Sequence, residues 1–257
     1  MDDHIKINFP PGVAISWGLE KQSNRGPKRE LNIDQIVEAA IAIADKEGIS
    51  SVSMNRVASS LGFTSMSLYR YIPSKDDLLI LMQDAACDIP NPIPEGDTDW
   101  RENLRKFYEA TIGVYIKHPW FGDIPITSIP ITPNNLQMID YVLGGIRELP
   151  LNDHEKMSII LLISNYARGA GEIMSDANQA IQAGASPGTF SGVDFSNALQ
   201  ELVTSDRFPN LHSLVAKGVY TDDNKDNDVG DDFEFGLERI LDGIERYLKL
   251  KEQKFDG

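Results

Sequence analysis

The sequence is poor in cysteine and has no long apolar run. Cys87 is the only cysteine among 257 residues, so an intrachain disulfide and a cysteine-based zinc site are both excluded. The longest nearly apolar run, residues 157–163, is much shorter than the roughly 18 to 20 residues that cross a bilayer. Acidic residues stand at positions 2 and 3, where a secretory signal peptide would carry positive charge. We therefore expect a cytoplasmic protein with no membrane partner.

The chain also lacks the short motifs that mark enzymes and metal sites. Its 4 histidines are scattered, and it contains no His-Glu-x-x-His zinc motif, no Gly-x-Ser-x-Gly nucleophile elbow and no Gly-Lys-Ser/Thr phosphate loop. The acidic loop at residues 222–232 does not place its oxygen ligands where a calcium-binding EF-hand requires them. We therefore expect no catalytic residue, no metal and no cofactor.

The net charge of −15 argues against a nucleic-acid partner, because proteins bind DNA largely through Lys and Arg. The charge is unevenly distributed, however: residues 1–88 carry a net charge of −3 and residues 89–257 a net charge of −12. In the first part, Arg25, Lys28 and Arg29 lie close together beside a Gly-Pro pair that prevents helix. We predict a basic arm on a nearly neutral module. The alternative is a disordered leader that adds solubility.

Hydrophobic periodicity predicts four helices in the first third of the chain. They begin near residue 33, and the fourth spans residues 75–87. The third is expected to end at residue 71 or 72 because Pro73 follows it. The residues expected to cap the four helices are Asn32, Ser53, Thr64 and Ser74.

The best domain boundary is the segment of residues 89–97, which contains three prolines and a glycine. The helices expected after it cover residues 99–116, 134–149, 153–183, 194–205, 209–217 and 233–251. No strand pattern of useful length occurs, so the predicted class is all-α. We expect an irregular extension over residues 1–31 that includes the basic arm, a helix-turn-helix domain over 32–88, and a larger helical domain over 89–257.

The segment from Ser53 to Tyr71 has the pattern of a helix-turn-helix. Two short helices meet across Leu61, Gly62 and Phe63, and a longer helix precedes them. The outward positions of the second short helix carry hydroxyl groups and tyrosines, which suit contacts with phosphates and base edges. The alternative is an ordinary corner between two helices of a bundle.

Residues 25–86 resemble the DNA-binding domain of the tetracycline-repressor (TetR) family of bacterial transcription regulators. The motifs are Ala-Asp-Lys-Glu-Gly, then Val-Ser-Met-x-x-Val-Ala-x-x-Leu-Gly, then Ser-Leu-Tyr-Arg-Tyr followed by Pro-Ser-Lys-Asp-x-Leu. A weaker similarity to the branch containing the tetracycline repressor itself continues through Asp-Trp-Arg at 99–101, His-Pro-Trp at 118–120 and Thr-Pro-Asn at 132–134.

The resemblance implies that residues 65–71 enter the major groove of a palindromic DNA operator. It assigns DNA contacts to Arg25, Lys28, Arg29, Ser53, Asn55, Ser65, Met66, Ser67, Tyr69, Tyr71 and Lys75. Of these, Asn55 and residues 65–67 would meet base edges, Tyr69, Tyr71 and Lys75 would hold phosphates, and the arm would approach the minor groove. For one of the two tyrosines, packing onto the fourth helix is the alternative.

Two helix faces in the C-terminal part favour a homodimer. The long helix after Asp153 places Ile160, Ser164, Ala167 and Gly171 at spacings of 4, 3 and 4. The last helix repeats apolar residues at 4, 3, 4 and 3, namely Phe233, Leu237, Ile240, Ile244 and Tyr247. Packing within one chain explains either face alone. Together, beside a helix-turn-helix whose single half-site binds weakly, they favour a dimer held by a four-helix bundle, as the resemblance also implies.

Aromatic and polar residues on three helices predict a pocket for a small-molecule effector. The candidates are Phe107, Tyr108, Thr111, Tyr115, Met138, Tyr141, Asn165, Tyr166, Arg168 and Glu172. For each of them, a place in the plain core is the alternative. Pro125 stands where the tetracycline repressor has a histidine that helps hold a metal-chelated drug, so magnesium-tetracycline is not the expected ligand.

The resemblance therefore implies a ligand-responsive transcriptional regulator, most simply a repressor, with a larger domain at 89–257 for ligand binding and dimerisation. A ligand between the helices of that domain would shift the fourth helix and separate the two DNA-reading heads. The other classes are a helical enzyme, opposed by the missing catalytic groups, and a protein-interaction module without DNA binding, opposed by the arm and the hydroxyl-rich third helix.

Overall fold

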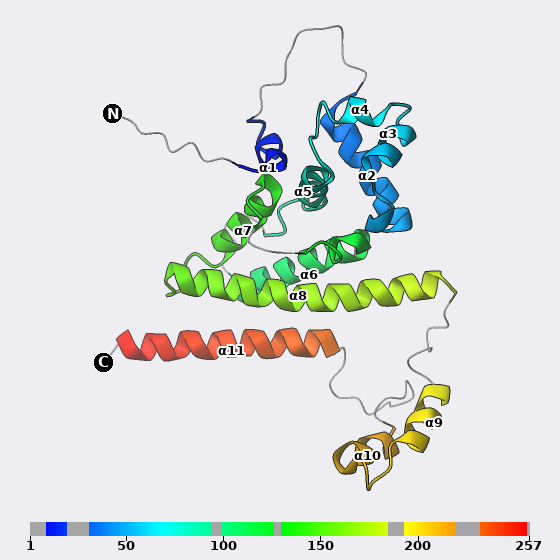
Figure 1. The fold of residues 1–257 in the computed structure, drawn as a ribbon. Helices are drawn as coiled ribbons and strands as arrows, with labels where there is room; N and C mark the ends of the chain where they lie inside the picture. The colour runs from blue at the N-terminus through cyan, green and yellow to red at the C-terminus, as the bar shows by residue number, and fades with distance from the viewer. Residues whose placement is uncertain are drawn as a thin grey trace. The chain divides into compact units, whose positions relative to one another are not determined.

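The computed structural model of the chain describes residues 9–19, 31–93, 99–125, 130–184, 193–218 and 232–255. Within these ranges the secondary structure is helical and contains no β-strand (Figure 1). The predicted all-α class is therefore confirmed. None of the helices in this part of the chain is long and apolar enough to span a membrane.

The helices form two compact units. The first unit comprises residues 1–172 and 243–257, and the second comprises residues 173–242. The helices of the first unit are α1 (Pro11–Ser16), α2 (Ile33–Glu47), α3 (Met54–Ser60), α4 (Ser65–Leu68), α5 (Lys75–Ala86), α6 (Trp100–Lys117) and α7 (Pro133–Gly145). It also holds the short 3-10 helices η1 (Ile49–Ser51) and η2 (Pro119–Phe121).

The second unit contains α9 (Val193–Leu202) and α10 (Pro209–Ala216). The two longest helices, α8 (Asp153–Gln182) and α11 (Asp232–Phe255), contribute residues to both units, because each unit boundary falls inside one of them. The N-terminal helices and the candidate ligand residues belong to the first unit.

Local capping bonds explain where most N-terminal helices begin. Asn32 accepts a hydrogen bond from the backbone N–H of Gln35, whose side chain in turn accepts from the backbone of Asn32. Ser53 and Ser74 cap α3 and α5 as predicted. Thr64 makes no capping bond to the backbone, because its hydroxyl pairs with that of Ser67.

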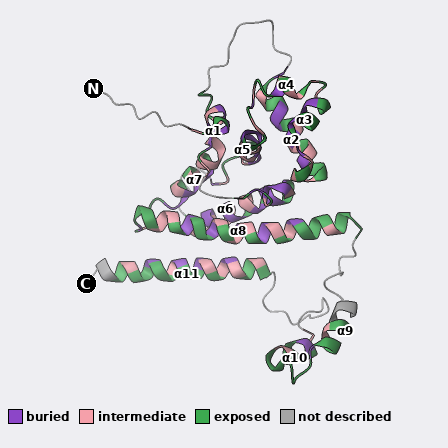
Figure 2. Cartoon of the chain, viewed as in Figure 1, coloured by how far each residue is buried: buried purple, intermediate pink, exposed green. Residues whose placement is uncertain are grey.

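The first helices enclose a continuous apolar core (Figure 2). Ile36, Val57, Leu68, Leu78 and Met82 have no exposed surface and come from α2, α3, α4 and α5. Four predicted helix ends are wrong. The helices expected to end at residues 205 and 251 end at Leu202 and Phe255. The third predicted helix stops at Leu68 and continues as a turn, and the helix expected to reach residue 149 stops at the glycine pair 144–145.

The N-terminal extension contains a helix that the sequence pattern did not predict. Residues 1–31 were expected to be irregular, but α1 packs on α5 and buries Val13 and Ile15 (Figure 1). The backbone N–H of Gly12 donates to Asp77 Oδ1 at 2.6 Å. The indole N–H of Trp17 donates to the carbonyl of Ile131 at 2.7 Å. The helix is therefore fixed both to the helix-turn-helix domain and to the loop before α7.

Close packing at Gly12 gives a direct test of this docking. A Cβ atom there would lie 2.9 Å from the backbone of Asp77, so Gly12→Ala should lower the free energy of unfolding by about 1 to 3 kcal/mol through overpacking. Gly113→Ala is the control, because its Cβ would meet no atom within 4 Å. Because Gly113 lies at an exposed position in the middle of α6, Gly113→Ala should raise the free energy of unfolding by about 0.5 to 1 kcal/mol. Urea denaturation measures both, and equal effects would mean that α1 is not docked.

Candidate DNA-binding and ligand sites

The helix-turn-helix consists of α3 and α4, joined by a tight turn. Gly62 has a φ of 77°, a left-handed conformation that favours glycine. The backbone N–H of Phe63 returns to the carbonyl of Ala58 at 2.9 Å. Leu68 and Ile72 are fully buried, as their positions predicted. The opposite side of α4 therefore faces away from the core.

The predicted DNA-contacting side chains fall into three groups. Ser53, Asn55, Met66, Tyr69 and Lys75 are exposed, and Met66 is 71% exposed. Ser65, Ser67 and Tyr71 are half-buried, and Tyr71 packs against the apolar core. Packing was the alternative considered for one of the two tyrosines. The arm residues Arg25, Lys28 and Arg29 lie outside the described residues.

One further cation belongs to this surface. Arg70 is exposed and follows Tyr69 in the turn after α4, and it was not among the predicted contacts. The nearby Arg56 differs from it, because its guanidinium pairs with Glu47 at the end of α2.

A cavity of about 410 Å³ lies in the first unit, between α5, α6, α7 and α8. Six candidates from the sequence line it: Phe107, Thr111, Tyr115, Met138, Asn165 and Arg168. Further lining residues, which the sequence pattern did not indicate, are Gln83, Cys87, Ile89, Val114, Phe121, Pro130, Asn135, Ile139, Met157, Ile160, Leu161 and Ser164. A signal for two of these was available, because Ile160 and Ser164 lie eight and four residues before the candidate Arg168, on the same helix face.

Four predicted ligand residues do not line the cavity. Tyr108 and Tyr166 stack on each other, with ring centroids 5.5 Å apart. Tyr141 is half-buried on α7. Glu172 accepts a hydrogen bond from Arg168 Nε at 2.7 Å. Three of these four side chains, those of Tyr108, Tyr166 and Glu172, thus contact other side chains.

The walls of the cavity are largely apolar. Tyr115 and Phe121 meet edge to face, with centroids 5.3 Å apart. Burial raises the pKa of Tyr115 to about 12 and that of the Cys87 thiol to about 12. Both groups are therefore neutral near pH 7 and add no charge to the lining of the cavity.

Two polar ties join the helix-turn-helix domain to the helices around the cavity. In the first, Asp84 on α5 accepts from the backbone N–H of Asn134 at 2.8 Å, and its own carbonyl accepts from the Asn134 side chain at 3.0 Å. Burial raises the pKa of the Asp84 carboxyl group. In the second, Asp45 Oδ1 at the end of α2 is 2.8 Å from His118 Nδ1 and accepts from Trp120 Nε1 at 2.6 Å.

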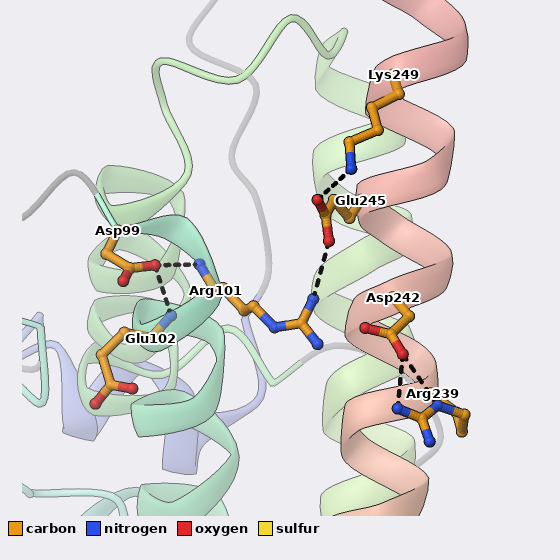
Figure 3. Close-up of polar contacts among 7 residues, drawn as sticks. All are labelled: Asp99, Arg101, Glu102, Arg239, Asp242, Glu245 and Lys249. Atoms are coloured by element: carbon orange, nitrogen blue, oxygen red, sulfur yellow. Dashed lines mark hydrogen bonds and ion pairs between the residues drawn. The ribbon is translucent and has the colours of Figure 1, made fainter.

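Ion pairs attach the C-terminal end of α11 to α6 and α8. Arg101, in the first turn of α6, pairs with Glu245, which also binds Lys249 (Figure 3). Asp99 caps that turn by accepting from two backbone N–H groups (Figure 3). Tyr247 and Lys251 both donate to Glu155 on α8 and lower the pKa of that carboxyl group to about 2.

The two predicted dimerisation faces are used largely inside the single chain. Ile160, Ala167 and Gly171 are buried, and a Cβ at Gly171 would lie 2.9 Å from the side chain of Tyr115. On the last helix Leu237 and Ile244 are buried as well. These five residues are thus covered within the single chain, because spacing alone does not distinguish internal from external helix contacts, and the dimer interface on α8 and α11 stays a prediction. Tyr247, a member of the predicted face on the last helix, is exposed, and so are Leu161, Leu162 and Leu250 on the same two helices.

Comparison with known proteins identifies two conserved domains. Residues 36–82 match the family model described as bacterial regulatory proteins, tetR family. Residues 91–248 match the model described as tetracyclin repressor-like, C-terminal domain. The chain is similar to the HTH-type transcriptional repressor DrrR1 of Streptomyces coeruleorubidus, at 37% identity over 91% of this chain and 84% of the relative. A Mycobacterium tuberculosis HTH-type transcriptional repressor is 24% identical over 90% of this chain and 86% of its own length.

Solved structures show the same fold. The TetR family protein ActR of Streptomyces coelicolor, in complex with (S)-DNPA, has a TM-score of 0.64 at 25% identity, covering 84% of this chain and 98% of ActR. ActR in complex with actinorhodin has a TM-score of 0.66 at 24% identity, covering 86% of this chain and 99% of ActR.

The tie at Asp45 yields a stability prediction. Asp45→Ala would leave the indole N–H of Trp120 without its acceptor, and this residue is only 1% exposed. We expect a loss of about 1 to 3 kcal/mol in the free energy of unfolding, and a smaller loss for Asp45→Asn, which keeps an acceptor oxygen. Glu38→Ala, at an exposed position of the same helix, should change stability by less than about 0.5 kcal/mol. Urea denaturation compares the three, and equal losses for Asp45→Ala and Glu38→Ala would refute the role of this tie.

Proposed function

This chain belongs to the tetracycline-repressor (TetR) family of bacterial regulatory proteins, and from that premise we propose that it binds a palindromic operator as a homodimer and leaves it when a small molecule fills the cavity. The family consists of DNA-binding transcriptional regulators and not of enzymes, and the chain is a ligand-responsive transcriptional repressor. Its place of action in this proposal is the cytoplasm, where bacterial DNA lies. The observation that carries the mechanism is that α5 belongs both to the core of the DNA-binding domain and to the wall of the cavity.

We place α4 in the major groove of the operator. Its exposed side carries small hydroxyl groups and Met66, which can approach base edges without a large entropy cost. In this arrangement Ser65, Met66, Ser67 and Asn55 read bases, whereas Ser53, Tyr69, Tyr71 and Lys75 contact phosphates. Arg25, Lys28 and Arg29 add electrostatic contacts from the arm. The exposed Arg70 supplies one more phosphate contact.

The release mechanism follows from the two sides of α5. Leu78 and Met82 are fully buried in the core shared with α2, α3 and α4. Gln83 lines the cavity, as does Cys87, which follows the helix directly. A ligand that separates α5 from α7 would therefore tilt the base of the DNA-binding domain. Such a ligand releases DNA only if it binds the tilted conformation more tightly than the DNA-competent one.

The complexes of ActR support a small organic molecule as the effector of this chain. ActR has been solved in complex with (S)-DNPA and in complex with actinorhodin. A volume of about 410 Å³ is within the usual range of small-molecule sites, roughly 300 to 1,000 Å³. Magnesium-tetracycline is not proposed, because Pro125 replaces the histidine expected for it.

The homodimer in this proposal uses the exposed apolar residues of α8 and α11. TetR regulators bind operators typically as dimers, and two linked heads bind two half-sites far more tightly than one. Leu162 is 47% exposed and Tyr247 is 44% exposed. Tyr247 belongs to the face predicted on the last helix, and Leu162 lies on α8 between the predicted Ile160 and Ser164.

Two groups of DNA contacts should respond differently to mutation. Changing Arg25, Lys28 and Arg29 together to Ala should weaken binding to all DNA sequences and lower the salt dependence by about one unit of slope per lost phosphate contact. Asn55→Ala should instead relax the preference at particular operator positions, at about 1 to 3 kcal/mol per lost contact. Fluorescence anisotropy with DNA from upstream of the chain's own gene, and with random DNA, measures both.

Ser60→Ala is the matched control on α3, because its hydroxyl bonds to the carbonyl of Val57 within the helix. We expect it to bind as the unmodified protein does. If the unmodified protein prefers no sequence over random DNA, the proposed function is wrong. If Asn55→Ala weakens operator and random DNA equally, that residue positions the protein without reading sequence.

Leu162→Glu should convert the dimer to a monomer that has lost operator binding. A charge at this exposed position costs little in the monomer but would be buried without a partner in the dimer. Ile116→Glu is the control, because Ile116 is also an exposed apolar residue, at 38%, but lies on α6. Sedimentation velocity reports the oligomeric state and circular dichroism the helix content. A Leu162→Glu protein that remains a dimer would show that the interface lies elsewhere.

A further inference from the structure

Arg168 is the one charged side chain among the described residues that line the cavity. The surrounding walls are rings and aliphatic groups, with aromatic side chains at Phe107, Tyr115 and Phe121. The other polar lining residues are neutral amides, hydroxyls and a thiol. A positively charged ligand would therefore find no carboxylate in this lining, which leaves neutral and negatively charged ligands as the classes that fit.

Two hydrogen bonds fix the position of the Arg168 guanidinium. Its Nε donates to Glu172 Oε1 at 2.7 Å, and its Nη2 donates to the carbonyl of Gly122 at 3.2 Å. Gly122 itself packs closely on Glu172, since a Cβ there would lie 3.1 Å from the glutamate side chain. An arginine side chain has five N–H donors, and Nη1 has no partner among the residues that the structure describes. The fixed guanidinium thus keeps donors for a ligand.

Glu172 orients the guanidinium of Arg168. Its carboxylate pairs with Arg168 but does not line the cavity. An anionic group of a ligand that enters the cavity loses its hydration, and it needs a paired, hydrogen-bonded partner to offset that cost. The planar guanidinium of an arginine is such a partner for an oxygen anion, because it can donate two parallel hydrogen bonds. Asn165 and Ser164, which also line the cavity on α8, add neutral polar groups near the same end of the pocket.

The geometry points to an effector that is a flat aromatic molecule with one acidic oxygen group, bound by Arg168 while its rings lie against the aromatic wall. This inference rests on the proposed role of the cavity as the effector site. In this inference, Arg168 is the residue that selects ligands by their charge. Aromatic rings stack or meet edge to face with Phe107, Tyr115 and Phe121, and these contacts hold the rings of acidic and neutral ligands alike.

Two fluorescent probes isolate the acidic group. 8-Anilinonaphthalene-1-sulfonate and N-phenyl-1-naphthylamine share the same ring system, and only the first carries a sulfonate. Fluorescence titration of the DNA-free protein should give an affinity about tenfold or more higher for the sulfonate probe, the effect of one charge-assisted hydrogen bond. Equal affinities for the two probes would overturn the inference.

Variants at Arg168 test the residue directly. Arg168→Gln should weaken the sulfonate probe about tenfold or more and leave the neutral probe within about twofold. Arg168→Lys keeps the charge without the planar fork, so it should restore part of the lost affinity. Circular dichroism and thermal unfolding check that each variant is folded. Unchanged affinity of the sulfonate probe in Arg168→Gln would also overturn the inference.

A cavity-filling variant locates the binding site. Thr111→Trp projects a large ring into the cavity from α6, so it should remove binding of both probes. Undiminished sulfonate binding in this variant would place the anion outside the cavity and contradict the inference. These titrations contain no DNA, so a negative result in them would not count against operator binding. Failure of operator binding would refute the proposed function without changing either probe affinity.

Discussion

Helix α5 is constrained on two sides at once. Leu78 and Met82 fill the core of the DNA-binding domain, while Gln83 and the adjoining Cys87 form part of the cavity wall. Asp84, also on α5, forms two hydrogen bonds with Asn134 in the N-terminal turn of α7. Because protein interiors are close-packed, a ligand that displaces the cavity side of α5 cannot leave its other side unchanged. In the proposed mechanism, this one shared helix couples the pocket to the DNA-reading surface.

A second connection restricts how the DNA-binding domain can move. Asp45, in the last turn of α2, hydrogen-bonds with both His118 and Trp120 from the corner after α6. Trp120 adjoins Phe121, a cavity-lining residue, with ring centroids 6.1 Å apart. The N-terminal helix α1 adds a third contact by lying on α5 at Gly12. Displacement of the cavity wall therefore acts on the domain at several fixed points, which favours a rigid tilt over local loosening.

Local features of the fold could be predicted from the sequence, whereas long-range docking could not. The cap at Asn32 involves a neighbour three residues away, so its pattern is visible in the sequence. The docking of Gly12 joins residues 65 positions apart, and nothing near Gly12 indicates Asp77 as its partner. The pocket was predicted in part for the same reason. Thr111 and Arg168 were predicted from the helix faces on which they lie. Cys87 was missed because its helix was assigned only to the DNA-binding domain. The stacking of Tyr108 on Tyr166 cannot be predicted from residue type alone.

The separation of the two DNA-reading heads tests the account most directly. A spin label at Met66→Cys would sit at a position that is 71% exposed on α4. Because Cys87 is half-buried and lines the cavity, Cys87→Ala is introduced as well, so that the label position carries the only thiol. Double electron–electron resonance on the dimer should show that Thr111→Trp, which fills the cavity, shifts the label-to-label distance by on the order of a few ångströms away from its operator-bound value. An identical distance distribution with the cavity empty and filled would contradict the claim that α5 couples the pocket to DNA binding.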